Sequence, residues 1–298
     1  MSKDLPPTSL LICSRNRPQL LWETVQSILT GGEVPAEMVI VDQSDRSDSR
    51  LSNFQAEEDC TIRYVWSERK GVSFGRNMAI SNASHSILVF TDDDMRATST
   101  WFGSLVRALL AAGPQAVVTG QVLASKDGSD GFTPSTRDDR QVVIYKGRVD
   151  RDVLFTGNMI GFRSTVDSIG GFDTRLGPGT RFPAAEDNDF AFRLLEAGYQ
   201  IIYEPGAVIY HRAWRSENEF LALHWNYGRG QGAFYSKHFN LRDPHMIRRM
   251  ARDVSGYVLR FPIRLFRNRV QAYRDMLYVA GMIYGAIQWR IQHRSKSV

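Results

Sequence analysis

Cysteines and long hydrophobic runs are scarce in this 298-residue sequence. Its two cysteines, Cys13 and Cys60, show neither metal-ligand spacing nor a disulfide framework, so we expect two reduced thiols. The most apolar stretch near the C-terminus, residues 276–289, has 14 residues, whereas a bilayer-spanning helix needs about 20. The N-terminus lacks a charged segment followed by an apolar one, so no secretory signal is expected. These absences favour a cytosolic protein over a secreted or membrane-spanning one.

The charge of the chain is unevenly distributed. The formal net charge is +5, but residues 241–298 contain twelve Lys or Arg and three Asp or Glu, a local charge of +9, which leaves −4 for the first 240 residues. Apolar residues recur among these arginines at roughly helical spacing, which predicts basic amphipathic helices. We expect this tail to bind an anionic membrane surface and not nucleic acid, since no recognition motif for nucleic acid is present. The alternative is a helical appendage whose arginines are simply solvated.

Short apolar strands alternate with helical patterns in the first hundred residues. Strands are expected at residues 9–13, 38–41, 61–66 and in the run 86–94, and each leads into polar residues. With 43% apolar residues, the chain can bury the core of one large domain or of two fused halves. The alternation predicts an α/β fold with a mostly parallel sheet, which collects ligands at the carboxyl ends of its strands. We therefore expect Asp42, Arg76 and the aspartates at 92–94 to lie around one crevice.

Three consecutive aspartates, Asp92, Asp93 and Asp94, end the fourth apolar run. Side chains alternate along a strand, so Asp92 and Asp94 would project to one side and Asp93 to the other. Carboxylates this close repel each other unless a cation lies between them, which favours a hard divalent metal such as Mg²⁺ or Mn²⁺. Taken alone, the same residues would also fit an acidic, solvated turn.

Residues 8–240 resemble the inverting glycosyltransferases of family 2, which have the GT-A fold: a Rossmann-like, mostly parallel mixed sheet flanked by helices. Residues 11–18, Leu-Ile-Cys-Ser-Arg-Asn-Arg-Pro, are similar to the opening strand and loop of that family. Residues 39–44 are similar to its nucleotide-contacting segment, with Gln43 and Ser44 in place of Asp-Gly. The segment beside the diphosphate corresponds to Gly71 and residues 75–77, with Gly75 where alanine is common, and the three aspartates match the Asp-x-Asp metal motif.

This resemblance implies a nucleotide-diphosphate sugar as the donor. The donor-contacting residues that it implies are Ser14, Arg15, Asn16, Arg17, Asp42, Gly71, Arg76, Asp92 and Asp93. Residues 156–159 and 169–173 resemble acceptor-side segments of the family, so Gly157 and Asn158 are expected to contact the acceptor. Trp214 is a further candidate for stacking on a sugar or lipid acceptor, and core packing would explain it equally well.

The sequence Glu-Asp-Asn-Asp at 186–189 precedes a helical pattern that stops at Gly198, so its carboxylates are expected at a helix N-terminus. The Glu-Asp motif of the family occurs at this position. The resemblance implies that Asp187 is the general base and that Glu186 orients the acceptor or the base, although acidic residues are also common helix N-caps. His211 follows a strand, where several family members have a histidine that completes the metal site with Asp92 and Asp94.

Together these features predict a metal-dependent, inverting glycosyltransferase at the cytoplasmic face of the cell membrane. Its acceptor would be a hydroxyl of a lipid-linked sugar or of a growing glycan. We expect residues 1–110 to form the nucleotide-sugar half, 111–240 the acceptor-binding and catalytic half, and 241–298 the membrane-associated tail. A nucleotidyltransferase on a related scaffold and a catalytically inactive membrane scaffold are the alternatives. The polar stretch 127–140 is expected to be a lid or a disordered insertion.

Overall fold

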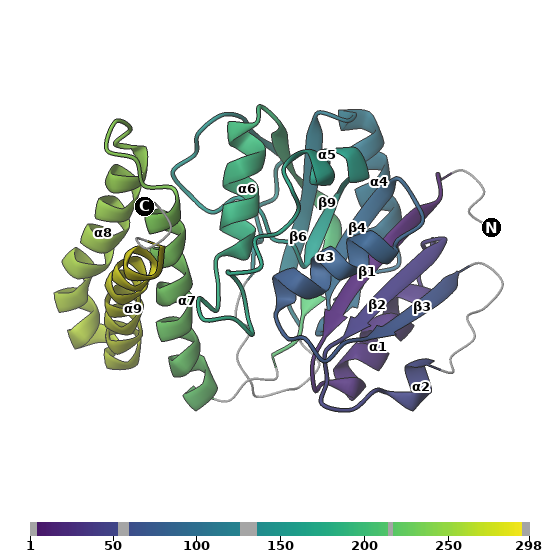
Figure 1. Ribbon diagram of the computed structural model, residues 1–298, viewed down its shortest axis with the longest axis horizontal. Helices are drawn as coiled ribbons and strands as arrows, with labels where there is room; N and C mark the ends of the chain where they lie inside the picture. The colour runs from purple at the N-terminus through teal and green to yellow at the C-terminus, as the bar shows by residue number, and fades with distance from the viewer. Residues whose placement is uncertain (1–4, 53–59, 126–135, 214–216, 294–298) are drawn as a thin grey trace. The chain divides into compact units, whose positions relative to one another are not determined.

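The computed structural model describes residues 5–52, 60–125, 136–213 and 217–293 (Figure 1). Within these ranges the strands are β1 (Thr8–Ser14), β2 (Glu37–Asp42), β3 (Thr61–Trp66), β4 (Ile87–Asp92), β5 (Met95–Ala97), β6 (Ala116–Ala124), β7 (Val143–Tyr145), β8 (Asn158–Phe162) and β9 (Gln200–His211). The helices are α1 (Pro18–Leu29), α2 (Ser49–Ser52), α3 (Val72–Asn82), α4 (Trp101–Ala112), α5 (Arg163–Ser168), α6 (Glu186–Glu196), α7 (Glu217–Lys237), α8 (His245–Arg267) and α9 (Arg269–His293).

The chain divides into two compact units. The first comprises residues 1–172 and 190–214 and contains all the strands named above with α1 to α5. The second comprises residues 173–189 and 215–298 and contains α7, α8 and α9. Helix α6 begins in the second unit and continues in the first. Trp214 and most of the predicted lid stretch lie outside the described residues.

The first unit is built on one mixed sheet with the strand order β3-β2-β1-β4-β8-β6-β9-β5, and β7 pairs with β9. Strands β1 to β4 are parallel to their neighbours within this group, whereas β8 runs antiparallel to both β4 and β6. The chain extends from β1 to β2 and β3 on one side and then returns to place β4 on the other side of β1. Such a switch point is where open α/β sheets bind ligands. The predicted α/β fold class is confirmed.

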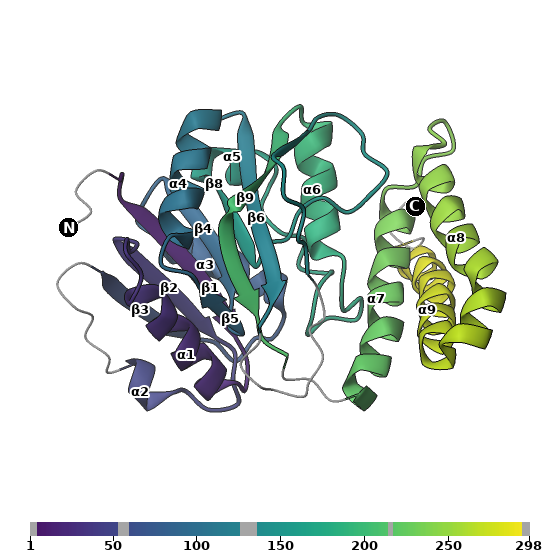
Figure 2. The ribbon, with the colours of Figure 1, turned by 180° about the vertical axis from the view of Figure 1, so that it is seen from behind.

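Helices cover both faces of this sheet, as the two opposite views show (Figures 1 and 2). Successive residues of β1 point to opposite faces, so Leu10 and Ile12 pack into the layer with α1 and α4. Leu11 packs with α3 and the part of α6 that belongs to this unit. All three are at most 2% exposed. A strand buried on both faces reads as a continuous apolar run, which is why β1 was recognisable without alternation.

The second unit depends on close contact between α7 and α9. An ideal Cβ on Gly232 would lie 1.9 Å from the carbonyl oxygen of Met282, and one on Gly285 would lie 2.1 Å from that of Arg229. Only glycine lets the two backbones approach this closely. No helix in the described part of the chain is long and apolar enough to cross a membrane.

The Gly232→Ala substitution is expected to lower the free energy of unfolding by about 2 kcal/mol, because the added methyl group meets the backbone of α9. Gly256→Ala is the matched control. An ideal Cβ there would be 3.3 Å from the flexible end of Arg260, and alanine favours a helix, so stability should stay the same or rise slightly. Chemical denaturation of both variants measures the difference. Equal destabilisation by the two substitutions would contradict the packing explanation.

Candidate active site

The polar ends of β1, β2 and β4 share one edge of the sheet at the switch point. The strand register places Ser14 beside Asp42, and Cys13 beside Asp92. Because these strands are parallel, the loops that follow them leave from the same edge. The predicted proximity of Asp42 and Asp92 therefore follows from the pairing of both strands with β1.

Asn16 ties the loop after β1 to the loop after β2. Its backbone N–H donates to Ser44 Oγ at 2.7 Å, and its side-chain amide exchanges two hydrogen bonds of 3.0 Å with Asp45. Its φ of 56° lies in the left-handed region, which asparagine tolerates better than most residues. Arg15, the preceding residue, is exposed. The loop predicted to contact the donor is thus held by hydrogen bonds of its own.

Asp42 is buried at the end of β2, with 2% exposure. Its Oδ2 accepts a hydrogen bond from the Tyr64 hydroxyl at 2.6 Å, and its Oδ1 accepts one from the backbone N–H of Ser44 at 2.9 Å. Burial and the bond to Asp42 raise the pKa of Tyr64, so its hydroxyl stays a donor. Trp66 is 40% exposed, and its Nε1–H donates to the Ser44 carbonyl at 3.0 Å. The sequence prediction missed this exposed aromatic because it ends an apolar strand.

Two departures from the family pattern, Gln43 and Gly75, lie against each other. Gln43 Nε2 donates to the carbonyl oxygens of Arg69 at 2.7 Å and of Gly71, the residue before α3, at 3.2 Å. An ideal Cβ on Gly75 would lie 3.3 Å from Gln43 Nε2 and 3.0 Å from Cys13 Sγ. Cys13 and Gln43 together therefore leave little room for an alanine at position 75.

The three aspartates are divided between two arginines. Asp92 is the last residue of β4, and a turn follows before β5, so the strand alternation predicted to continue through Asp94 stops at Asp92. Asp92 Oδ1 lies 3.0 Å from Arg76 Nη2. Arg17 Nη1 lies 2.8 Å from Asp93 Oδ1 and 3.6 Å from Asp94 Oδ2. Arg17 was predicted to contact the donor, and its contact with these carboxylates was not foreseen.

Asp93 is buried and contacts both α1 and β1. Its Oδ2 accepts a hydrogen bond from Ser14 Oγ at 2.7 Å. Burial raises the pKa of the Asp93 carboxyl to about 6, although the Arg17 guanidinium opposes this shift. The Thr24 hydroxyl lies 2.8 Å from the Asp93 carbonyl oxygen and 2.7 Å from that of Met95, which holds the backbone of the turn against α1.

His211 lies beside Asp94 because of the pairing between β5 and β9. In this antiparallel pair Met95 stands opposite His211, and Asp94 is the residue before Met95. His211 Nε2 is 3.4 Å from Asp94 Oδ1, and both residues are buried. Imidazole is a common metal ligand, and Mg²⁺ or Mn²⁺ needs only one or two protein ligands when phosphate oxygens and water complete its shell.

Asp94 and His211 are therefore the residues that could hold a divalent cation. Asp92, the third residue of the predicted set, has its carboxylate beside Arg76. In the ranges that the structure describes, no group of three His, Cys, Asp or Glu side chains is arranged to hold a metal ion.

Arg76 and Asn77 anchor the predicted acceptor-side segment to α3. The Asn77 amide donates to the Phe172 carbonyl at 2.8 Å and accepts from the Phe172 N–H at 2.9 Å. The Arg76 guanidinium lies over the Phe172 ring, 5.3 Å from its centroid. The same helix thus carries the arginine that faces Asp92 and holds Phe172, the last residue of the unit's first chain segment.

Gly157 and Asn158, both predicted to contact the acceptor, have different surroundings. An ideal Cβ on Gly157 would lie 2.5 Å from Asp92 Oδ2, so glycine is required beside this carboxylate. The Asn158 amide is fully buried and donates to the carbonyls of Gln121 and Ala207 at 2.9 Å each, while its oxygen accepts from Trp101 Nε1 at 2.8 Å. These bonds join strands and α4, and an acceptor contact by Asn158 stays a prediction.

Glu186 and Asp187 occupy the first turn of α6, which begins at Glu186 as the sequence predicted. Glu186 is buried and Asp187 is partly exposed. Acidic groups are favoured here because the helix dipole is positive at its N-terminus. Ala185, just before the helix, has a φ of 68°, and its carbonyl accepts the N–H of Asp189 at 2.9 Å. This pair of carboxylates belongs to the second unit.

A sheet of this topology, with an acidic turn at its switch point, is the architecture of the GT-A glycosyltransferases. The model of the Glycosyl transferase family 2 matches residues 9–170, more than half of the chain. The protein belongs to this family and is a glycosyltransferase.

Known relatives agree with this assignment. A glucosyl-dolichyl phosphate glucuronosyltransferase from Haloferax volcanii is 26% identical, over 71% of each chain. The mannosyltransferase PcManGT from Pyrobaculum calidifontis, solved with GDP-Man and Mn²⁺, has a TM-score of 0.61 at 17% identity, covering 97% of this chain and 90% of its own. S. aureus TarS (residues 1–349), solved with UDP, has a TM-score of 0.55 at 13% identity and coverages of 98% and 92%. The structure of GalNAc-T7 with UDP, GalNAc and Mn²⁺ has a TM-score of 0.56 at 16% identity. It covers 82% of this chain, which spans 52% of the length of that protein.

Proposed function

We propose that this protein is a metal-dependent, inverting glycosyltransferase that moves a sugar from a nucleotide diphosphate to an acceptor hydroxyl. The observation that carries this proposal is the buried Asp94 and His211 pair beside the switch point. Structures of the same fold have been solved with GDP-Man or UDP-GlcNAc, and one of them with Mn²⁺ as well. Residues 1–110 would supply the nucleotide-sugar half, 111–240 the acceptor-binding and catalytic half, and 241–298 the tail.

Donor binding would use the loops after β1, β2 and β4. The proposed donor-contacting residues are Ser14, Arg15, Asn16, Arg17, Asp42, Gly71, Arg76, Asp92 and Asp93. Asp94 and His211 would hold the metal, Mn²⁺ or Mg²⁺, with Asp92 as the remaining candidate ligand. When bound, such a metal neutralises negative charge that develops on a leaving diphosphate. Arg76, buried and fixed by Asp92 and Phe172, is a preorganised cation for the same purpose.

Asp187 would act as the general base. Its partly exposed carboxylate can accept the proton of the acceptor hydroxyl as the oxygen attacks the anomeric carbon. The bond to the diphosphate breaks on the opposite face of the sugar, so a single displacement inverts the anomeric configuration. Glu186, buried next to it, would orient the acceptor or the base, and Gly157, Asn158 and Trp214 are the proposed acceptor-side residues.

The decisive experiment measures the products released from UDP-, GDP- and dTDP-sugars with Mn²⁺ or Mg²⁺. Metal-dependent release of a nucleoside diphosphate from one donor supports the proposal and identifies the donor. Release of nucleoside monophosphate or pyrophosphate would indicate attack at a phosphorus atom, as in a nucleotidyltransferase. Absence of both donor binding and release would favour the inactive scaffold.

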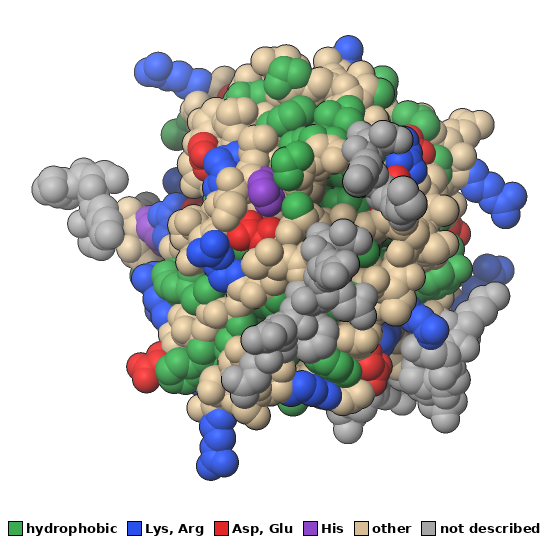
Figure 3. Space-filling model, turned by 90° about the vertical axis from the view of Figure 1, so that its right-hand side faces the viewer, with side chains coloured by type: hydrophobic (Ala, Val, Ile, Leu, Met, Phe, Trp, Pro, Cys, Tyr) green, Lys and Arg blue, Asp and Glu red, His purple; other side chains and the backbone are tan. Residues whose placement is uncertain are grey.

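We further propose that α8 places the protein on an anionic membrane surface, where a lipid-linked acceptor would be reached. Leu259, Ile263 and Phe266 are 74%, 59% and 90% exposed on this helix. The exposed arginines of α8 are Arg248, Arg252, Arg260 and Arg267. Apolar side chains among arginines suit the boundary between anionic headgroups and acyl chains. On the face of the molecule shown in Figure 3, in contrast to α8, Lys and Arg side chains are scattered among acidic and hydrophobic ones.

The Phe266→Ser substitution is expected to weaken binding to phosphatidylglycerol vesicles roughly tenfold, because a buried phenyl ring contributes about 1.5 kcal/mol or more. Val142→Ser, which replaces a 54% exposed side chain of the first unit, should leave vesicle binding unchanged. Vesicle co-sedimentation at low and high salt measures both. Equal binding of wild type to neutral vesicles, or stronger binding to DNA than to anionic vesicles, would contradict the membrane proposal.

A further inference from the structure

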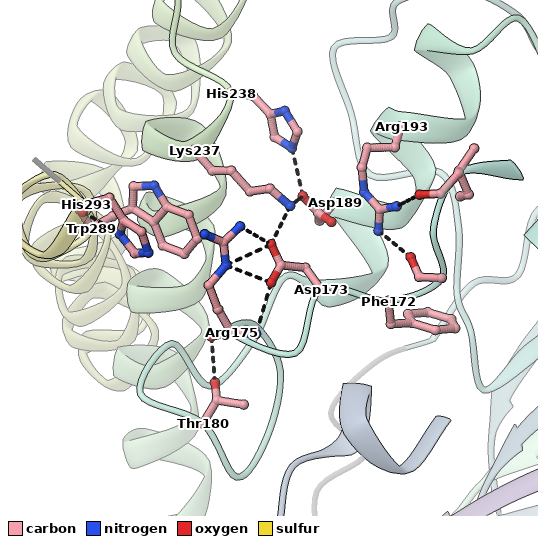
Figure 4. Close-up of polar contacts among 12 residues, drawn as sticks. Phe172, Asp173, Arg175, Thr180, Asp189, Arg193, Lys237, His238, Trp289 and His293 are labelled. Atoms are coloured by element: carbon pink, nitrogen blue, oxygen red, sulfur yellow. Dashed lines mark hydrogen bonds and ion pairs between the residues drawn. The ribbon is translucent and has the colours of Figure 1, made fainter. Parts of the chain in front are cut away.

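Lys237, the last residue of α7, and His238, which follows it, contact the first turn of α6 (Figure 4). Asp189 is fully buried, and its Oδ1 lies 2.5 Å from Lys237 Nζ and 2.7 Å from His238 Nε2. The contacts lie within the second unit, which also contains Asp187. Asp189 is two residues after Asp187 in the same turn, so whatever fixes Asp189 also fixes the backbone that carries the proposed base.

Lys237 also joins the two ends of the segment 173–189. Its Nζ lies 2.6 Å from Asp173 Oδ2, and Asp173 and Asp189 are the first and last residues of that segment. Arg175 holds the same carboxylate through Nη2 at 2.6 Å. Burial alone would raise the pKa of Asp173, but the hydrogen bonds from Arg175 and Lys237 outweigh it and hold the pKa well below its usual range. Lys237 therefore forms ion pairs with the carboxylates at both ends of the segment 173–189.

Further contacts from α7 reach this turn and the backbone just before it. An ideal Cβ on Gly230 would lie 2.4 Å from the Ala184 carbonyl oxygen, so the backbones meet directly. The Asn188 amide donates to Gln231 Oε1 at 2.7 Å. Positions 230, 231 and 237 lie on α7, and His238 directly follows the last residue of the helix.

The backbone before the turn is strained. Ala185 has a φ of 68°, in a region that costs a residue with a Cβ about 1 to 2 kcal/mol. Such a conformation persists only where surrounding contacts determine it, and it is enriched at functional sites. Residues of α7 contact Ala184, which precedes Ala185 in the sequence, and Asn188 and Asp189, which follow it. The backbone is therefore held on either side of Ala185.

We propose that Lys237 and His238 are positioning residues for catalysis, which hold the turn that carries Glu186 and Asp187 in its reactive conformation. This inference rests on the proposed function, in which Asp187 of this turn is the general base. Lys237 neutralises the buried Asp189, and His238 fixes the orientation of the same carboxylate. Removing either partner leaves a buried charge with fewer partners, which loosens the first turn of α6.

Hydrogen exchange of the free protein tests the positioning without any substrate. In Lys237→Met, amides of residues 186–189 should exchange about tenfold faster than in wild type, while those of β1 stay unchanged. Lys237→Arg should restore most of the protection, and His238→Gln should give an intermediate effect. Lys146→Met, which removes an exposed lysine of the first unit, is the matched control. Unchanged exchange at 186–189 in Lys237→Met would overturn the inference.

The catalytic role of the turn is tested by measuring turnover with the donor identified among the UDP-, GDP- and dTDP-sugars. Lys237→Met should lower kcat about tenfold or more and leave the KM for the donor within about twofold. If Lys237 acts through Asp187, the same substitution should cost nothing further in an Asp187→Asn background. A fall in melting temperature without this split between kcat and KM would indicate a structural ion pair and overturn the inference.

The two proposals fail in different ways. An inactive Asp187→Asn with a fully active Lys237→Met would refute the positioning role and leave the proposed function intact. A fully active Asp187→Asn would refute Asp187 as the base and, with it, the purpose assigned to the turn. Faster exchange, reduced kcat and non-additivity with Asp187→Asn together would support both.

Discussion

Asp187→Asn is expected to lower the turnover number for sugar transfer by about 10² to 10⁴, the usual contribution of a general base. Asparagine has nearly the same shape as aspartate and cannot accept the proton of the acceptor hydroxyl. The proposed donor-contacting residues and the proposed metal pair lie elsewhere in the chain, so metal-dependent donor binding should stay near the wild-type value. Single-turnover transfer and calorimetric titration with the donor measure the two quantities separately.

Asp167→Asn provides the control for this substitution. Asp167 is an exposed carboxylate on α5, and the same chemical change there should alter neither turnover nor donor binding. A product with retained anomeric configuration would contradict the single displacement, whatever the rate. Wild-type turnover in Asp187→Asn would show that another group removes the proton.

Asp94→Ala is expected to lose metal-dependent donor binding together with activity, with turnover reduced roughly 10² or more, since a bound metal contributes several kcal/mol of charge stabilisation. Asp94 is buried and has the His211 imidazole 3.4 Å away, so its loss removes half of the proposed metal pair. His211→Ala should show the same pattern. Donor titrations with and without Mn²⁺ are the measurement.

Asp167→Ala is the matched control, and its Mn²⁺ dependence should equal that of wild type. The paired variants discriminate between the roles, because Asp187→Asn should keep the effect of Mn²⁺ on donor binding and Asp94→Ala should lose it. Undiminished Mn²⁺ dependence in both Asp94→Ala and His211→Ala would show that the metal is held elsewhere. Full activity of wild type in a chelator would remove the metal from the mechanism.

Much of the first unit could be predicted because its signals are local. The strand β1 is an apolar run that a polar loop terminates, and the same holds for β2 and β4. Parallel pairing then requires their ends to meet, which brought Asp42 and Asp92 to one edge without any knowledge of side-chain positions. The start of α6 at Glu186 was likewise visible, since acidic residues precede its helical pattern.

Side-chain partners could not be predicted in this way. Arg17 and Asp93 are 76 residues apart in the chain, and Lys237 and Asp189 are 48 apart, so nothing in the local sequence of either pair indicates the contact. The strand rule also failed at Asp94, because β4 ends two residues earlier and a turn sets the direction of the side chain. Asn158 matched an acceptor-side segment, yet its amide joins β6, β8 and β9 to one another.

The sequence by itself determined the fold class and the order of the motifs, because hydrophobic periodicity and strand ends are properties of short segments, and the resemblance of those motifs indicated the family. Only the tertiary structure decided which ionisable side chains meet: Arg76 with Asp92, Arg17 with Asp93, Asp94 with His211, and Lys237 with Asp189. These pairs depend on strand register and helix packing between distant segments. Whether a carboxylate binds a metal, accepts a proton or holds a turn depends on such partners, and a motif alone leaves that choice open.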